Sequence, residues 1–204
     1  SNAQYADNRT LIRCWLRWCQ ANLYRTMGLL ERATAEAEQI FVRLAGVATS
    51  RHQQWLLLMN HWLQTQLTQL SGDLPAARQQ AQAMVTRFQD TNFPALFYDQ
   101  AVEAQFFQAH AHALLGQITW QLGDYGEAQQ QTQQALALRA AIGEQRYKAF
   151  NLVTLATILQ TVGEQEKATR CVQEALQISQ ADGDAIAHAH ALVALARLER
   201  EQGA

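Results

Sequence analysis

The feature that most limits the fold of this chain is a glycine followed five residues later by an alanine. This pair occurs four times, as Gly28–Ala33, Gly72–Ala77, Gly123–Ala128 and Gly163–Ala168. Successive glycines are 44, 51 and 40 residues apart, and Gly203, another 40 residues on, begins a fifth copy. Self-similarity at such intervals predicts a repeat architecture, in which each unit buries apolar surface only against its neighbours.

A second series of glycines supports the same register. Gly143 and Gly183 are also 40 residues apart, and Gly46 takes the equivalent place in the first repeat. Glycine suits these places because a residue just past a helix end often needs positive φ. Each unit is therefore expected to read helix, glycine turn, helix, glycine turn. The predicted helices are 5–26, 30–45, 51–70, 74–90, 95–121, 125–141, 145–161, 165–181 and 185–202.

The residues after the first glycine of each unit predict how the second helix starts and packs. Asp124 and Glu127 form a D-x-x-E capping arrangement, and Asp73 can cap in the same way with Pro75 in the first turn. Two antiparallel helices joined by a short turn come closest near that turn. The repeated alanines are expected at this contact, because only a small side chain fits there.

Composition excludes several classes of protein. With 49% hydrophobic and 17% charged residues, the chain is too apolar for disorder. Apolar runs such as 55–59 are far short of the ~20 residues that span a bilayer. A formal charge of −2 argues against nucleic-acid binding. The three cysteines, Cys14, Cys19 and Cys171, lack metal-ligand spacing and are expected to be reduced thiols of a cytoplasmic protein. Residues 1–3 are interpreted as a tag remnant.

Several residues resemble the tetratricopeptide repeat (TPR). In one unit they are Leu115-Gly116, Gly123-Asp124-Tyr125, Ala128 and Ala135-Leu136; in the next, Leu155-Ala156, Gly163, Ala168 and Ala175-Leu176; and the last begins with Leu195-Ala196. The 40-residue period is similar to that of bacterial signalling proteins such as maltose-activator-type transcription regulators and TPR-linked diguanylate cyclases. The resemblance implies an all-α, right-handed α-α superhelix of about four and a half helical hairpins. Its N-terminal hairpins would occupy 4–92 and its C-terminal hairpins 93–204.

The resemblance also implies a binding surface. In TPR proteins the first helix of each hairpin lines a concave face that holds a protein or peptide partner. The residues assigned to it for partner binding are Trp62, Gln66, Gln117, Trp120, Gln121, Thr157, Gln160 and Arg197. The same projection places Trp15, Trp18, Asn22 and Met59 there. Core packing is the alternative for all four tryptophans, Trp15, Trp18, Trp62 and Trp120.

The sequence lacks the motifs of common catalytic and nucleotide-binding sites. No G-x-x-x-x-G-K-[ST], G-x-G-x-x-G, G-x-S-x-G or H-E-x-x-H motif occurs. We therefore expect no enzyme activity in this segment, no cofactor and no metal. The pairs His110/His112 and His188/His190 point about 200° apart on a helix, so neither pair can share an ion. Acidic residues are expected in turns and on outer faces, and the glutamines of 129–134 on a solvated face.

Two functions are consistent with these features. The chain is either the sensor or interaction segment of a larger bacterial regulator, or a groove receptor for a small ligand or signalling peptide. An aromatic cluster either buries an irregular joint between the two halves or forms a ledge for a ligand. Its members are Phe93, Phe97, Tyr98, Phe106 and Phe107. The last helix repeats the first-helix pattern without a second helix to cover it. This predicts that Ala204 lies inside a longer protein, and that the last helix self-associates or frays.

Overall fold

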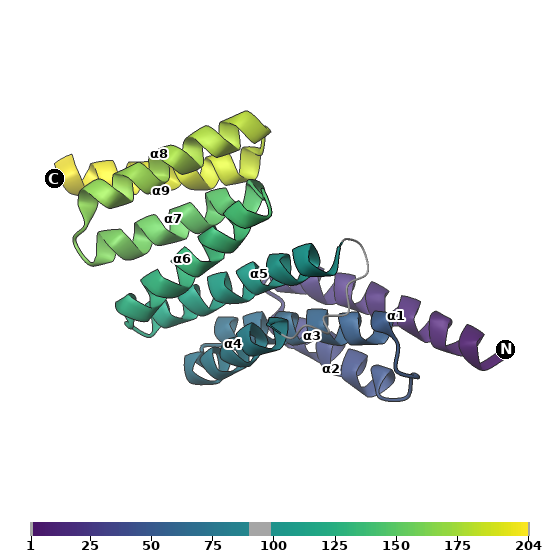
Figure 1. Ribbon diagram of the computed structural model, residues 1–204. Coiled ribbons are helices and arrows are strands. Elements are labelled where there is room, and N and C mark those ends of the chain that lie inside the picture. The colour runs from purple at the N-terminus through teal and green to yellow at the C-terminus, as the bar shows by residue number, and fades with distance from the viewer. Residues whose placement is uncertain (1, 90–98, 204) are drawn as a thin grey trace. The chain divides into compact units, whose positions relative to one another are not determined.

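The computed structural model describes residues 2–89 and 99–203, and the regular secondary structure of these residues is entirely helical (Figure 1). The helices are α1 (Asn2–Thr26), α2 (Leu30–Leu44), α3 (Arg51–Leu70), α4 (Leu74–Phe88), α5 (Gln100–Gln121), α6 (Tyr125–Ala141), α7 (Arg146–Thr161), α8 (Gln165–Asp182) and α9 (Ala185–Gly203). This confirms the predicted all-α fold, and most boundaries agree within one or two residues. The predicted start of the fifth helix at residue 95 lies outside the described residues.

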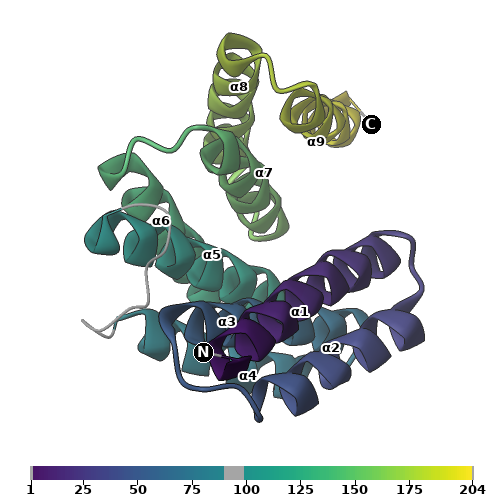
Figure 2. The ribbon, with the colours of Figure 1, turned by 90° about the vertical axis from the view of Figure 1, so that its right-hand side faces the viewer.

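The helices pair into antiparallel hairpins within two compact units, Ser1–Ala104 and Gln105–Ala204. In the first unit α1 packs beside α2 and α3 beside α4; in the second, α7 packs beside α8 and α8 beside α9 (Figures 1 and 2). The boundary between the two units falls inside α5. The sequence predicted this boundary between residues 92 and 93. Each unit is described separately below.

The turns after α1, α5 and α7 have the same two backbone hydrogen bonds, and the turn after α3 shares the first of them. After α5, the Gly123 N–H donates to the Trp120 carbonyl (3.0 Å) and the Asp124 N–H donates to the Thr119 carbonyl (2.9 Å). Gly123 has φ +85°, a backbone conformation that is sterically unfavourable for a residue with a side chain. Five other glycines share this positive φ, namely Gly28, Gly72, Gly143, Gly163 and Gly183. The repeated glycines therefore do end helices, as predicted.

Two local expectations have different outcomes. The Asp124 carboxylate accepts the Glu127 N–H (3.3 Å) and the Asp73 carboxylate accepts the Ala76 N–H (3.2 Å), so both predicted caps are present. Gly46 lies in the turn after α2, but its φ is not positive. The turn of the first unit therefore differs from the turns at Gly143 and Gly183.

The repeated alanines lie at the contact between the helices of a hairpin. All four, Ala33, Ala77, Ala128 and Ala168, are fully buried. Opposite them, the backbones approach closely: a Cβ built on Gly116 would lie 2.5 Å from Thr132 Oγ1 and 3.2 Å from the Ala128 carbonyl oxygen. The small residues at 116 and 128 thus allow α5 and α6 to pack at this distance.

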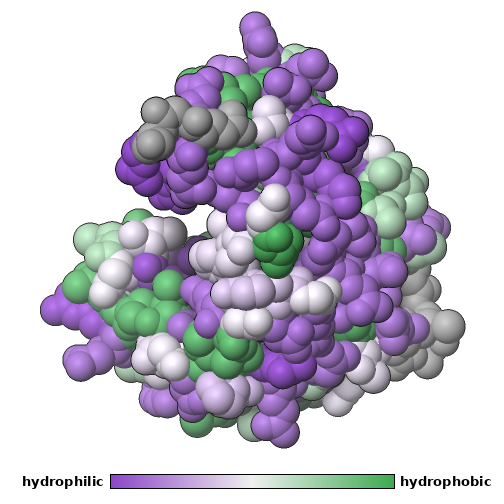
Figure 3. All heavy atoms as spheres, turned by 90° about the vertical axis from the view of Figure 1, so that its left-hand side faces the viewer, coloured by the Kyte–Doolittle hydropathy of each residue, from purple (hydrophilic) through white to green (hydrophobic). Residues whose placement is uncertain are grey.

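Hydrophobic residues reach the surface in separate patches. On the face shown in Figure 3, hydrophilic residues predominate and the hydrophobic ones are scattered among them. None of the helices in the described part of the chain is long and apolar enough to cross a membrane. Of the predicted aromatic cluster, Phe107 is buried and Phe106 is half-buried, while Phe93, Phe97 and Tyr98 lie outside the described residues.

Candidate functional site

The first helices of the hairpins in the second unit lie side by side. The His110 ring of α5 is 4.5 Å from the Tyr147 ring of α7, measured between centroids, and the Phe150 ring of α7 is 5.3 Å from the His190 ring of α9. Helices α7 and α9 also pack directly. We call the side-chain layer that α5, α7 and α9 carry between residues 105 and 203 the first-helix surface.

The 40-residue period places equivalent residues on successive helices of this surface. Gln117 on α5, Thr157 on α7 and Arg197 on α9 are 40 residues apart. Gln117 and Arg197 are exposed, and Thr157 is half-buried with its hydroxyl donating to the Val153 carbonyl (3.0 Å). The first-helix surface therefore carries the neutral amide of Gln117 on α5 and the positive charge of Arg197 on α9.

Trp120 connects the ends of two first helices. Its indole Nε1–H donates to Thr161 Oγ1 across α5 and α7 at 3.2 Å, and the side chain is half-buried. Gln121 is exposed on the next residue of α5, and Gln160 is half-buried beside Thr161 in the sequence of α7. The Trp120 indole is therefore half-buried and oriented by its hydrogen bond to Thr161.

The predicted residues of the first half belong to the other unit. Trp62 and Gln66 are half-buried on α3. Met59 was projected onto the same surface, but it is buried, so that assignment is wrong. The error arises because α1 covers this part of α3: the Trp18 indole N–H donates to the Met59 carbonyl at 3.1 Å.

The remaining tryptophans of the first unit form an aromatic cluster around Trp15. The Trp15 ring lies 5.3 Å from Trp18 and 5.4 Å from Trp55, yet Trp15 is still 39% exposed. Trp55 is buried, and its indole N–H donates to the Glu103 carboxylate at 3.0 Å. Glu103 is thus an exception to the expectation that acidic residues lie in turns and on outer faces. Nothing in the local sequence of Glu103 marks it, because its partner is 48 residues away.

Sequence reasoning missed the row of rings that crosses the first-helix surface. Phe106, His110, Tyr147, Phe150 and His190 follow one another with centroid distances between 4.5 and 6.4 Å. Phe150 and His190 are 40 residues apart, as are His110 and Phe150. The signal was therefore present in the repeat register, as an aromatic or imidazole ring at the same position of three successive helices.

A buried cation lies beneath one end of this row. Arg139 of α6 is almost fully buried; its guanidinium donates to Glu144 Oε2 (3.1 Å) and to His110 Nδ1 (3.3 Å) and lies 5.0 Å from the centre of the Tyr147 ring. Because arginine has no acceptor, His110 Nδ1 must accept, so that ring nitrogen carries no proton. Burial, and then the charge of Arg139, hold the pKa of His110 well below its usual range. The imidazole of His110 is therefore neutral at neutral pH.

Two other histidines of this unit also contact a neighbouring helix. His112 Nδ1 lies 2.6 Å from Gln131 Oε1, and His188 Nδ1 lies 3.1 Å from Ser179 Oγ. Gln131 is half-buried by this contact, so the glutamine run of α6 is not solvated throughout. Within residues 2–89 and 99–203, no three His, Cys, Asp or Glu side chains are grouped so that they could hold a metal ion.

Comparison with known proteins supports the repeat. Residues 107–181 match the model of the family described as "Tetratricopeptide repeat". Among solved structures, the chain is similar to BtubC (BKLC) from P. vanneervenii, with 13% sequence identity, a TM-score of 0.61 and coverage of 98% of this chain and 89% of that one. At this identity the likeness concerns the fold alone. No curated protein matches the chain.

The tetratricopeptide repeat is a non-catalytic scaffold that generally mediates protein–protein interaction. Its expected elements are in place over the matched segment: paired helices, glycine turns with positive φ and fully buried alanines at the hairpin contacts. The chain is therefore an all-α, TPR-like helical-repeat domain, with tetratricopeptide repeats over residues 107–181.

Proposed function

We propose that this domain binds a protein or peptide on the first-helix surface of residues 105–203. The observation that carries the proposal is the position of Trp120, half-buried and oriented by its hydrogen bond to Thr161. Tryptophan is among the residue types most enriched at binding hot spots. The neighbouring amides, Gln117 and Gln121, are exposed and can both donate and accept.

The chemistry of the surface favours an extended peptide or a helix with few charges. Glutamine side chains can pair with the backbone amides of an extended partner, and Trp120 supplies apolar area for one large side chain. Arg197 places a positive charge at the α9 end, where an acidic group of the partner would pair with it. We propose further that the domain is the sensor or interaction segment of a larger signalling or transcriptional regulator. Support for that role comes from the similarity of its 40-residue period to the repeats of such proteins.

Replacing Trp120 with alanine is expected to weaken binding by at least about tenfold, the usual loss at a hot spot. The probe is a set of peptides selected on the wild-type domain from a phage-displayed random library. Dissociation constants are then measured for wild type, Trp120→Ala and a control, Gln173→Ala, whose side chain is exposed on α8. Selected peptides that bind Trp120→Ala as tightly as wild type would contradict the site. So would a Trp120 that acrylamide cannot quench and whose loss unfolds the domain.

A second proposal concerns the apolar face of α9. Leu192 is 47% exposed, whereas Leu152, its equivalent 40 residues earlier, is 4% exposed and packs against Ala175 of α8. Ala196 is likewise exposed, whereas Ala156 is buried against α8. No second helix covers this face of α9 among the described residues. We propose that α9 either associates with a second copy through this face or frays.

The expected result is a mass from light scattering that rises with protein concentration, or hydrogen exchange in residues 186–200 that is faster than in α7. The variant Leu192→Ser should lower the association without unfolding the domain, because Leu192 is exposed. A matched variant, Leu70→Ser at the exposed end of α3, should have no effect on mass. A monomer in which residues 186–200 are as protected as α7 would exclude both versions.

A further inference from the structure

One face of α3 packs on the α1/α2 hairpin, and the same face of α9 packs on the α7/α8 hairpin. In α3 this face includes Leu63 and Leu67, which form a cluster with Ala21 of α1 and Ala33 and Ala37 of α2. In α9 the equivalent positions, Ala187, Ala191 and Leu198, are buried against α7 and α8. The face is apolar because it forms the contact between consecutive hairpins.

Helix α1 has the same apolar face, but nothing in the described residues of its own unit, 2–89 and 99–104, covers it. Ile12, Leu16 and Leu23 are 61%, 61% and 57% exposed, and Cys19 between them is exposed as well. We call these four residues the α1 stripe. Ile12, Cys19 and Leu23 correspond to the buried Leu56, Leu63 and Leu67 of α3, each 44 residues later. Their spacing of four, three and four residues is that of a helix seam that accepts another helix.

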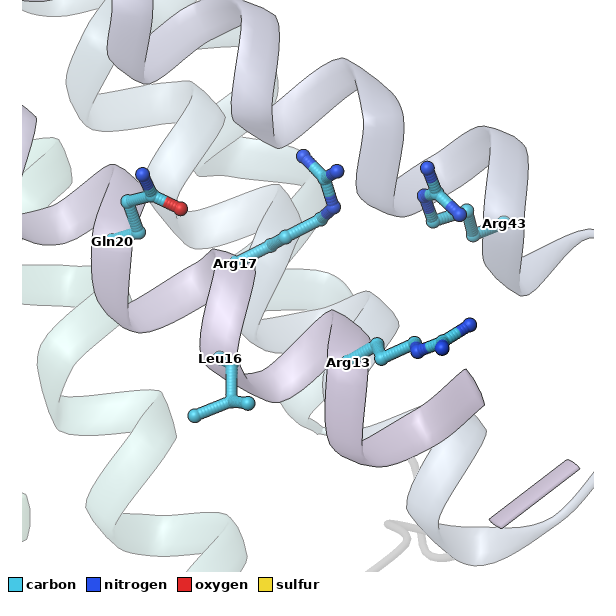
Figure 4. Close-up of a pocket in the computed structure, with 5 residues that line it drawn as sticks. All are labelled: Arg13, Leu16, Arg17, Gln20 and Arg43. Atoms are coloured by element: carbon cyan, nitrogen blue, oxygen red, sulfur yellow. The ribbon is translucent and has the colours of Figure 1, made fainter. Parts of the chain in front are cut away.

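Positive charge flanks this stripe on one side. Arg13, Leu16, Arg17, Gln20 and Arg43 line an open pocket of about 350 Å³ (Figure 4). In Figure 4 the Arg13 and Arg17 side chains extend from α1 towards the end of α2 that carries Arg43, while Leu16 points away from them. Arg17 pairs with Glu36. Arg13 and Arg43 have no acidic partner among the described residues, so this edge carries an excess of positive charge.

The opposite edge of the stripe is uncharged and aromatic. Trp15 lies there, stacked on Trp18 and in tilted contact with Trp55. A helix placed along the stripe would therefore meet apolar side chains along its centre, guanidinium groups on one side and an indole on the other. Self-pairing of two such faces would add no acidic partner for Arg13 or Arg43, whereas a helix with a row of carboxylates on one edge would supply one.

We propose that the α1 stripe and the arginines beside it bind an amphipathic helix of another protein, whose apolar face is bordered by aspartate or glutamate. The surface lies on α1 and α2, so it does not depend on the function proposed for the first-helix surface. The apolar contacts supply the affinity, and the arginines fix which edge of the incoming helix faces α2.

The test uses two synthetic helical peptides of about five turns, which is longer than the stripe by more than one turn. Both carry leucine at the seam positions; one has glutamate and the other lysine at the flanking positions. The readout is the rate at which N-ethylmaleimide labels Cys19 in the full chain, followed by mass spectrometry. Cys171 is half-buried and far from the stripe in sequence, so it serves as the internal control thiol.

The glutamate peptide should slow Cys19 labelling at least about tenfold more than the lysine peptide, with Cys171 unchanged. Leu16→Ser should abolish the protection, and Leu70→Ser, an exposed leucine on α3, should leave it intact. The double variant Arg13→Glu, Arg43→Glu should prefer the lysine peptide. Because all these side chains are exposed, none of the variants is expected to unfold the domain.

Three results would overturn the proposal. Equal protection by both peptides would show that the arginines have no part in the choice of partner. No protection by either peptide would show that the stripe does not accept a helix. Protection of Cys19 that appears without peptide, rises with protein concentration and disappears in Leu16→Ser would identify a second copy of this chain as the occupant instead.

Discussion

Ala128→Leu and Ala168→Leu should each lower the free energy of unfolding by about 3 kcal/mol, the upper part of the range for overpacked cores. Both alanines are fully buried at the start of a second helix. Each faces a small residue of the first helix: Gly116 approaches the Ala128 carbonyl, and Ala156 lies in one cluster with Ala168. A leucine would have to push the two helices apart, because Gly116 and Ala156 have no flexible side chain that could change its rotamer to make room. Urea denaturation followed by circular dichroism measures the change.

The matched controls introduce leucine on the outer face of the same helices. Gln130→Leu on α6 and Glu166→Leu on α8 replace exposed residues, so their free energies of unfolding should stay within about 0.5 kcal/mol of wild type. If the two alanine variants melted like wild type, these alanines would not lie at a helix–helix contact, and the repeat register would be wrong.

Glu144→Gln is expected to be comparably destabilising, by about 3 kcal/mol, although it changes neither shape nor volume. The Glu144 carboxylate accepts from the buried Arg139 guanidinium (3.1 Å) and from the Tyr147 N–H at the start of α7 (3.0 Å). Burial lowers the pKa of Arg139, but an arginine remains charged at neutral pH. An amide at 144 would leave that charge without its counter-ion inside the protein.

A surface ion pair of the same unit provides the control. Lys148 and Glu174 are 2.8 Å apart, and both side chains are more exposed than Arg139, so Glu174→Gln should cost no more than about 0.5 kcal/mol. The double variant Arg139→Met, Glu144→Gln should be more stable than Glu144→Gln alone, because it removes the uncompensated charge. Equal effects of Glu144→Gln and Glu174→Gln would show that Arg139 does not depend on Glu144.

The helices and their ends could be predicted from the sequence because the interactions that set them are local. The side chain of Asp124 caps the helix that begins one residue later, and Gly123 ends the helix before it. The repeats strengthened the prediction of these turns, because each unit independently indicated the same turn. Where the repetition was imperfect, the prediction was weaker: Gly46 lies in its turn without the positive φ of Gly143 and Gly183.

The candidate site was predictable only in part. The period places Gln117, Thr157 and Arg197 at one position of three successive helices, so their alignment follows from the sequence. The contact between Arg139 and His110 joins residues 29 apart on two helices, and no local pattern marks either one. Buried polar contacts of this kind depend on the distance between packed helices, which the sequence pattern does not contain.

The sequence by itself determined which residues form helices, where the turns fall and which faces are apolar. Only the tertiary structure decided which of those apolar faces are covered. Leu63 of α3 and Leu16 of α1 belong to the same kind of stripe, yet one is buried under the preceding hairpin and the other is exposed. The periodicity of the sequence shows that a helix face is apolar. The pattern is identical whether or not a neighbouring helix covers that face. Exposure depends on the neighbour, and therefore on how the hairpins stack.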